Sequence, residues 1–171
     1  ANSSYLPDIS PVPQIIAVMI LSLAALVVTV TIKGKGELSI WNVLACIPLG
    51  LSPYFLECLS YKFDSPYMAL SILASVLPLL FYQKRWMWYS LSVVVCMLVM
   101  CMTYQAASGI FPMFVVLLTL IWYVRKEDLK KIGSFILCSA VSYGIGVGIF
   151  FLFIMKHVST YVSNGLAGLS G

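Results

Sequence analysis

The sequence predicts an all-α fold, a polytopic bundle of about six membrane-spanning helices. Of its 171 residues, 61% are hydrophobic and 9% are charged, and the mean hydropathy is +1.01. Long apolar stretches fill most of the chain, as is typical of a protein whose outer surface faces hydrocarbon. We interpret each stretch as a helix, because an unclosed strand would leave backbone groups unpaired in lipid. Residues 1–171 are therefore expected to form one transmembrane domain.

The expected spans are 12–32, 38–51, 67–81, 86–103, 106–124 and 132–155. The second and third are shorter than the roughly 20 residues that a bilayer core requires. We expect them to recruit residues of the connection between them, to tilt, or to stop short of the outer face.

The distribution of cations predicts the orientation of these spans. With the N-terminus outside, eight of the ten Lys and Arg residues fall in inner connections, and only Lys62 and Lys156 fall outside. All four tryptophans also lie near inner connections, as interfacial anchors do. Both ends of the chain are then extracytoplasmic. The net charge of +4 reflects this topology. The basic residues are scattered over short loops, which argues against a nucleic-acid partner.

The start of the chain suggests a piece of a longer protein. It begins at Ala1 without a methionine, and the polar segment before the first span has no basic region like that of a signal peptide. We expect upstream spans, and residues that matter for function, to belong to the complete protein.

The polar connection 52–66 is the most informative segment for function. As a helix over about 53–65 it would carry Tyr54, Glu57, Tyr61 and Asp64 on one stripe and apolar side chains on the other. Pro53 suits a first helical turn. The pattern predicts an amphipathic juxtamembrane helix lying in the outer interface with its carboxylates toward water.

Paired carboxylates beside aromatic side chains indicate a sugar site. Glu57 and Asp64 are candidates for a catalytic base and a substrate-orienting group. Tyr54 and Tyr61 offer faces and hydroxyls to a sugar ring, and Lys62 offers a cation to a phosphate. The alternative interpretation is an ordinary anchoring helix whose polar face meets water.

Three weaker signals lie elsewhere. Tyr104 and Gln105 end a span at the outer face, where they can line a pocket with the 52–66 connection or serve as an interfacial anchor. Lys156 and His157 can contact a lipid phosphate, although snorkelling and an interfacial position explain them as well. Ala140, Gly144 and Gly148, spaced four apart, favour close packing of another helix.

Metal and cofactor chemistry have no support in the sequence. The chain has no CxxC, no Cys/His cluster and no DxD pair, and its five cysteines imply no disulfide framework. We expect neither a metal nor a cofactor.

Two segments resemble a known family. SPYFLECLSYKFDSPYMALSILASVLPLLF and the later MTYQAASGIFPMFVVLL are similar to the serotype-converting O-antigen glucosyltransferases of bacteria, the Gtr group of GT-C-type membrane enzymes. The resemblance covers roughly residues 52–118 and rests on a linear pattern of ordinary residues. The matching positions are Tyr54, Phe55, Leu56, Ser60, Tyr61, Asp64, Ser65, Tyr104, Gln105 and Ala106.

The resemblance implies a polyprenyl-phosphate sugar donor, a surface polysaccharide acceptor and transfer on the extracytoplasmic side of the bacterial inner membrane. This chain departs from the family pattern in one respect. Family members carry acidic residues in an outer loop after their first span, and that span and loop have no counterpart here. Asp64 and Glu57 are then substrate-binding residues rather than the base, and the fragment alone is inactive. The alternatives are part of a lipid or polysaccharide transporter or flippase, and a non-catalytic membrane partner.

Overall fold

The structure is a computed structural model that describes residues 11–33, 40–44, 53–61, 63–82 and 85–156. Within these residues the secondary structure is helical, which confirms the predicted all-α class. The helices are α1 (Val12–Lys33), α2 (Ile40–Leu44), α4 (Pro53–Ser60), α5 (Ser65–Val76), α6 (Trp86–Thr103), α7 (Ile110–Val124) and α8 (Leu129–Ile149). The 3-10 turn η1 (Leu77–Phe81) extends α5, η2 (Gln105–Gly109) precedes α7, and the π-helical segment η3 (Phe150–Met155) extends α8.

Four helical segments are long and apolar enough to cross a membrane: Val12–Lys33, Trp86–Thr103, Gln105–Val124 and Leu129–Met155. They agree closely with four of the six predicted spans. The segment Ser65–Phe81 is apolar but shorter. Of the predicted span 38–51, the structure describes only α2 and gives it five helical residues. The described chain therefore has four full-length candidates where the sequence predicted six spans.

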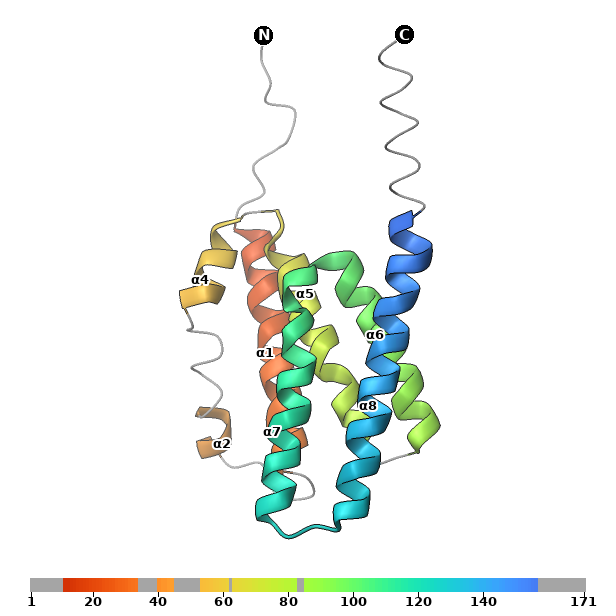
Figure 1. The fold of residues 1–171 in the computed structure, drawn as a ribbon. Coiled ribbons are helices and arrows are strands. Elements are labelled where there is room, and N and C mark those ends of the chain that lie inside the picture. Colours follow the sequence, from red (N-terminus) through yellow and green to blue (C-terminus); the bar gives the residue numbers. More distant parts are fainter. Residues whose placement is uncertain (1–10, 34–39, 45–52, 62, 83–84, 157–171) are drawn as a thin grey trace, which may run out of the picture.

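The helices pack as two groups that share α5 (Figure 1). α1 and α5 run in the same direction and pack through small and β-branched side chains such as Ala24, Val28 and Ala69. α6 packs on α8 around a core of larger side chains that includes Tyr89, Met97 and Phe135, to which α7 contributes. The first pair thus packs through smaller side chains and the second group through bulkier ones.

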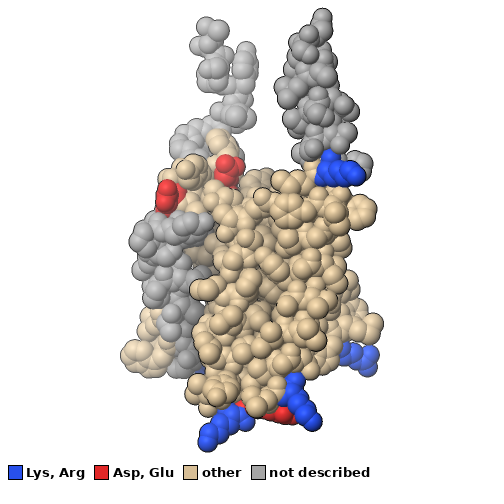
Figure 2. All heavy atoms as spheres, in the orientation of Figure 1, with Lys and Arg blue, Asp and Glu red and all other residues tan. Residues whose placement is uncertain are grey.

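The bundle has two charged ends and an uncharged belt between them (Figure 2). We call one the Asp64 end, where α1, α5 and α7 begin and α6 and η3 finish, and the opposite one the Arg125 end. The belt exposes large apolar side chains, such as Met113, Leu91 and Leu137, which are 73%, 55% and 68% exposed. Side chains of this kind in contact with the surroundings fit a hydrocarbon solvent.

The single amphipathic helix predicted over 53–65 is wrong in its extent. α4 ends at Ser60, and the chain turns before α5 begins at Ser65. Pro66 occupies the first turn of α5, where it needs no N–H partner, whereas in a continuous helix it would interrupt the hydrogen-bond ladder. Glu57 and Asp64 therefore belong to different helical segments and do not share one stripe.

Candidate functional site

A cavity of about 520 Å³ lies at the Asp64 end between α4, α5, η2 and α7. Its described walls are largely apolar and include Met113, whose side chain is 73% exposed. Its described lining residues are Cys58, Met68, Ile72, Tyr104, Ala106, Ala107, Gly109, Ile110, Met113 and Phe114. The structure thus brings Tyr104 and the 52–66 connection to one cavity.

The Tyr104–Gly109 wall of this cavity is held from two sides. Tyr143 on α8 donates its hydroxyl proton to the Ser108 carbonyl over 3.1 Å, and its ring stacks on Phe111 with centroids 5.8 Å apart. From α5, the Ser75 hydroxyl lies 3.5 Å from the Ala107 carbonyl, a long hydrogen bond. Both contacts join residues more than 30 positions apart, so packing between helices fixes the position of η2.

The two candidate carboxylates lie beside this cavity and outside its described lining. Glu57 is exposed on α4 and directly precedes Cys58, which lines the cavity. Asp64 is exposed at the start of α5, where its backbone carbonyl accepts from the N–H of Met68, another lining residue, over 3.0 Å. The exposed Asp64 side chain makes no capping hydrogen bond to α5.

Cys58 anchors α4 to the bundle. Its side chain is buried against Ala17, Leu21 and Ala69. Burial raises the pKa of the Cys58 thiol, and the neighbouring charge of Glu57 raises it further. A protonated thiol is a poor nucleophile, so Cys58 acts in packing and in shaping the cavity.

The other predicted site residues are spread over the same end. Tyr61 and Gln105 are exposed, Tyr104 is half-buried, and Lys156 is exposed at the end of η3. The side chain of Tyr54, together with Lys62 and His157, lies outside what the structure describes. Their roles in binding stay predictions.

Two buried polar atoms at this end lack a hydrogen-bond partner in the described part of the chain. They are Ser65 Oγ at the start of α5 and Gln14 Oε1 near the start of α1. Buried polar atoms are nearly always satisfied, so unpaired ones mark the Asp64 end as a region with capacity for further polar contacts.

The predicted small-residue stripe packs on no described helix. Ala140 and Gly144 are exposed, and a Cβ added at Gly144 or Gly148 would meet nothing within 4 Å. Close approach occurs instead at Gly146, where an added Cβ would lie 3.0 Å from Met97 Cβ on α6. Packing of another helix on the stripe remains a prediction.

The described residues include no group of three His, Cys, Asp or Glu side chains that could hold a metal ion.

Comparison with known proteins adds the family. The protein family described as "Glucosyl transferase GtrII" matches this chain over residues 1–170. The chain belongs to this family. The resemblance to the Gtr glucosyltransferases is thereby confirmed.

One relative of this GtrII chain comes from Salmonella phage P22, an "uncharacterized 55.3 kDa protein in gtrB 5'region". The two are 25% identical over 154 residues, which cover 90% of this chain and 31% of the relative. The chain thus spans about a third of that relative's length. No solved structure matches the chain.

Sequence reasoning on this GtrII chain missed the residues that shape the cavity. Tyr143 and Ser75 lie inside apolar spans, and Met68 and Phe114 look like ordinary membrane-facing residues in the sequence. A hydroxyl within an apolar span is the one signal that would have singled out Tyr143 and Ser75, since such groups seek partners in a membrane.

Proposed function

We propose that this chain forms part of a membrane glucosyltransferase that transfers glucose from a polyprenyl-phosphate donor to a surface polysaccharide such as O-antigen. The observation that carries the proposal is the GtrII match over residues 1–170. It favours the enzyme over the transporter, flippase and non-catalytic alternatives. Because the chain spans 31% of its phage relative, the activity is proposed for the complete protein.

The cavity at the Asp64 end supports a lipid-linked donor. Its described walls are made mainly of side chains such as Met68, Ile110 and Phe114, which suit an isoprenoid chain, and the lining residue Met113 is exposed in the apolar belt. Tyr104 gives it a hydroxyl, and exposed Gln105 lies next to it in the chain. A lipid tail in the cavity would bring the attached phosphate and sugar toward Glu57 and Asp64.

The proposed reaction is a displacement at the anomeric carbon. A carboxylate, from Asp64, from Glu57 or from a residue elsewhere in the complete protein, takes the proton of the acceptor hydroxyl. The acceptor oxygen then bonds to the anomeric carbon while the bond from that carbon to the phosphate oxygen breaks. Polyprenyl phosphate leaves with the bonding electrons. Lys62, Lys156 and His157 are candidates to meet its charge.

Sugar recognition is proposed for the tyrosines of the connection. Tyr61 is 53% exposed beside Asp64, and an exposed aromatic face there can stack on a sugar ring. Tyr54 and Gln105 are the other residues proposed to bind the sugar, and the Gln105 amide can both donate and accept hydrogen bonds.

The proposed location is the bacterial inner membrane, with the Asp64 end extracytoplasmic. Cationic side chains concentrate at the Arg125 end, which favours that end for the cytoplasm. A cysteine replacing Tyr61 should react with a membrane-impermeant reagent in intact cells, and a cysteine replacing Lys130 only after permeabilisation. The reverse labelling pattern would overturn the orientation.

A donor-exchange assay tests the activity itself. The complete protein in vesicles should transfer labelled glucose from a polyprenyl-phosphate donor to the polysaccharide acceptor. Transfer from a nucleotide sugar in the absence of any lipid-linked donor would contradict the proposed donor, and no transfer from either would contradict the enzyme.

A further inference from the structure

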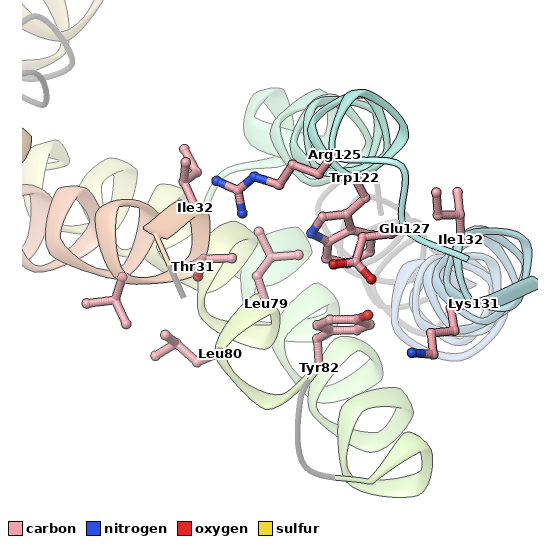
Figure 3. Close-up of a pocket in the computed structure, with 11 residues that line it drawn as sticks. Thr31, Ile32, Leu79, Leu80, Tyr82, Trp122, Arg125, Glu127, Lys131 and Ile132 are labelled. Carbon is pink, nitrogen blue, oxygen red and sulfur yellow. The ribbon is translucent and has the colours of Figure 1, made fainter. Parts of the chain in front are cut away.

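A second cavity, of about 630 Å³, lies at the Arg125 end (Figure 3). It forms where the end of α1, the end of η1, the end of α7 and the start of α8 converge. The proposed glycosyl transfer makes no use of it, because the candidate carboxylates and the Tyr104 wall lie at the opposite end. Its lining combines charged, aromatic and aliphatic side chains.

The charged part of the lining favours an anion. Arg125 and Lys131 enter the cavity from opposite sides in Figure 3, with Glu127 between them. Among the described lining residues, two cations and one carboxylate leave a positive balance. A guanidinium and an ammonium are the side chains that most often bind phosphate, one through a planar fork and the other as a point charge.

A cluster of packed aromatic side chains forms part of the cavity wall. Tyr82 and Trp122, both in the lining, stack with their ring centroids 4.5 Å apart. Phe135 packs on both rings, with its centroid 4.9 Å from Tyr82 and 4.8 Å from Trp122. Contacts among aromatic rings of this kind hold side chains in place and reduce the entropy lost when a ligand binds.

Tyr82 supplies a neutral hydrogen-bond donor beside the cations. Burial raises the pKa of the Tyr82 hydroxyl, and the charge of Glu127 raises it further. The phenol therefore keeps its proton at physiological pH and can donate to a phosphate oxygen.

The remaining described wall is mainly aliphatic and belongs to the membrane ends of the helices. It is formed by Val30, Thr31, Ile32, Leu79, Leu80 and Ile132, of which only Thr31 is polar. Leu80 is 37% exposed, so part of this wall is open to the surroundings of the bundle. A free phosphate ion would meet the cations and leave this wall without a ligand, whereas a phosphate carrying acyl chains would contact both surfaces.

We propose that the cavity lined by Arg125, Lys131, Tyr82 and Leu80 binds an anionic glycerophospholipid of the adjacent leaflet. The Arg125 guanidinium and the Lys131 ammonium contact the phosphate once the exposed Glu127 side chain turns out of the space between them. The Tyr82 hydroxyl donates to the phosphate, and the first part of an acyl chain follows Leu80. Basic pockets between helix ends at a membrane face suit such headgroups. The bound lipid would fasten the ends of α1, α7 and α8 to each other, far from the proposed transfer site.

The test measures lipid binding to the purified complete protein by native mass spectrometry. Phosphatidylglycerol should bind more tightly than phosphatidylcholine of the same acyl composition. The double variant Arg125→Gln/Lys131→Gln should weaken phosphatidylglycerol binding by at least about tenfold, because it removes both phosphate-binding cations.

The matched control is Lys126→Gln/Lys130→Gln. It removes the same charge from the same connection, but neither side chain belongs to the cavity lining. This variant should bind phosphatidylglycerol as the unchanged protein does. Equal losses in the two double variants would show unspecific surface attraction and overturn the site.

Two further measurements distinguish binding of a whole lipid from binding of its phosphate group alone. Inorganic phosphate at millimolar concentration should not displace phosphatidylglycerol, since it lacks the acyl chain that contacts Leu80. Leu80→Ser should weaken lipid binding without changing helical content. Displacement by phosphate alone, or equal binding of the anionic and zwitterionic lipids, would overturn the proposal.

Discussion

The two ends of the bundle carry cavities of similar volume, about 520 Å³ and about 630 Å³, whose rims differ in charge and therefore in chemistry. At the Asp64 end the described carboxylates Glu57 and Asp64 stand beside an apolar chamber. At the Arg125 end, Arg125 and Lys131 belong to the lining. Apolar walls at either end can take a lipid tail. The charge of the rim determines which group is favoured beside the cavity. Carboxylates favour an acceptor hydroxyl, and cations favour a bound phosphate.

The largest effect is expected at the contact between α6 and α8, the two helices that run between both ends of the bundle. Gly146→Leu should lower the free energy of unfolding by ~1–3 kcal/mol, because its side chain would collide with Met97 and Val94 and push α6 from α8. Gly144→Leu is the control, since a Cβ at this position meets nothing within 4 Å. Thermal unfolding in detergent measures both. Destabilisation by Gly144→Leu in the complete protein would show that the stripe with Ala140 and Gly148 packs on another helix.

The next test addresses the chemistry of the Asp64 end. Asp64→Asn in the complete protein should reduce sugar transfer at least about tenfold, equivalent to ~1.4 kcal/mol of barrier, because the amide cannot accept a proton or carry the charge. The same substitution at Asp128 is the control. Asp128 caps α8 by accepting from the Lys130 N–H over 3.1 Å, a role that asparagine also fills. Unchanged transfer by Asp64→Asn would remove Asp64 from the site.

Glu57→Gln separates the two carboxylates. A loss confined to kcat would indicate a role in proton transfer, while a raised KM for the acceptor with little change in kcat would indicate sugar binding. The effect should be smaller than that of Asp64→Asn, because Asp64 is one of the positions that match the Gtr pattern and Glu57 is not. Steady-state kinetics of both variants decide the order.

A smaller loss of stability is expected from a substitution in the wall of the cavity at the Asp64 end. Tyr143→Phe removes the hydrogen bond to the Ser108 carbonyl and keeps the stack on Phe111, at a cost of about 0.5–1.5 kcal/mol. The KM for the donor should rise, and phosphatidylglycerol binding at the Arg125 end should not change. Tyr123→Phe, at a side chain 66% exposed, is the control. Equal effects at both ends would show that the two cavities are coupled.

The smallest expected difference is in salt dependence. Raising the ionic strength from about 0.1 M to about 1 M shortens the Debye length from about 10 Å to about 3 Å, so phosphatidylglycerol binding through Arg125 and Lys131 should weaken. Donor binding in the apolar cavity at the Asp64 end should change less. A comparable salt response at the two ends would remove the distinction between their rims.

The sequence by itself determined where the chain is helical and apolar. The span predicted at 86–103 coincides with α6, and α1 and α7 begin and end within one residue or a few residues of their predicted bounds. Hydropathy is enough for this, because a backbone in hydrocarbon must satisfy its own hydrogen bonds and a helix does so locally. The resemblance to the Gtr glucosyltransferases, drawn from two linear segments, extended to the family of the whole chain.

Tertiary structure alone decided which faces pack and where the cavities form. In α6, Val93 is fully buried and Leu91 is 55% exposed, although both are ordinary apolar residues. In water such a difference would show as an amphipathic pattern, but in a membrane the packed face and the lipid-facing side are both apolar. The rotation of each helix is therefore set by steric fit, as at Gly146, and by hydroxyl pairs such as Tyr89 with Ser139, 2.6 Å apart. Those contacts join residues distant in the chain, which is why a linear reading does not reach them.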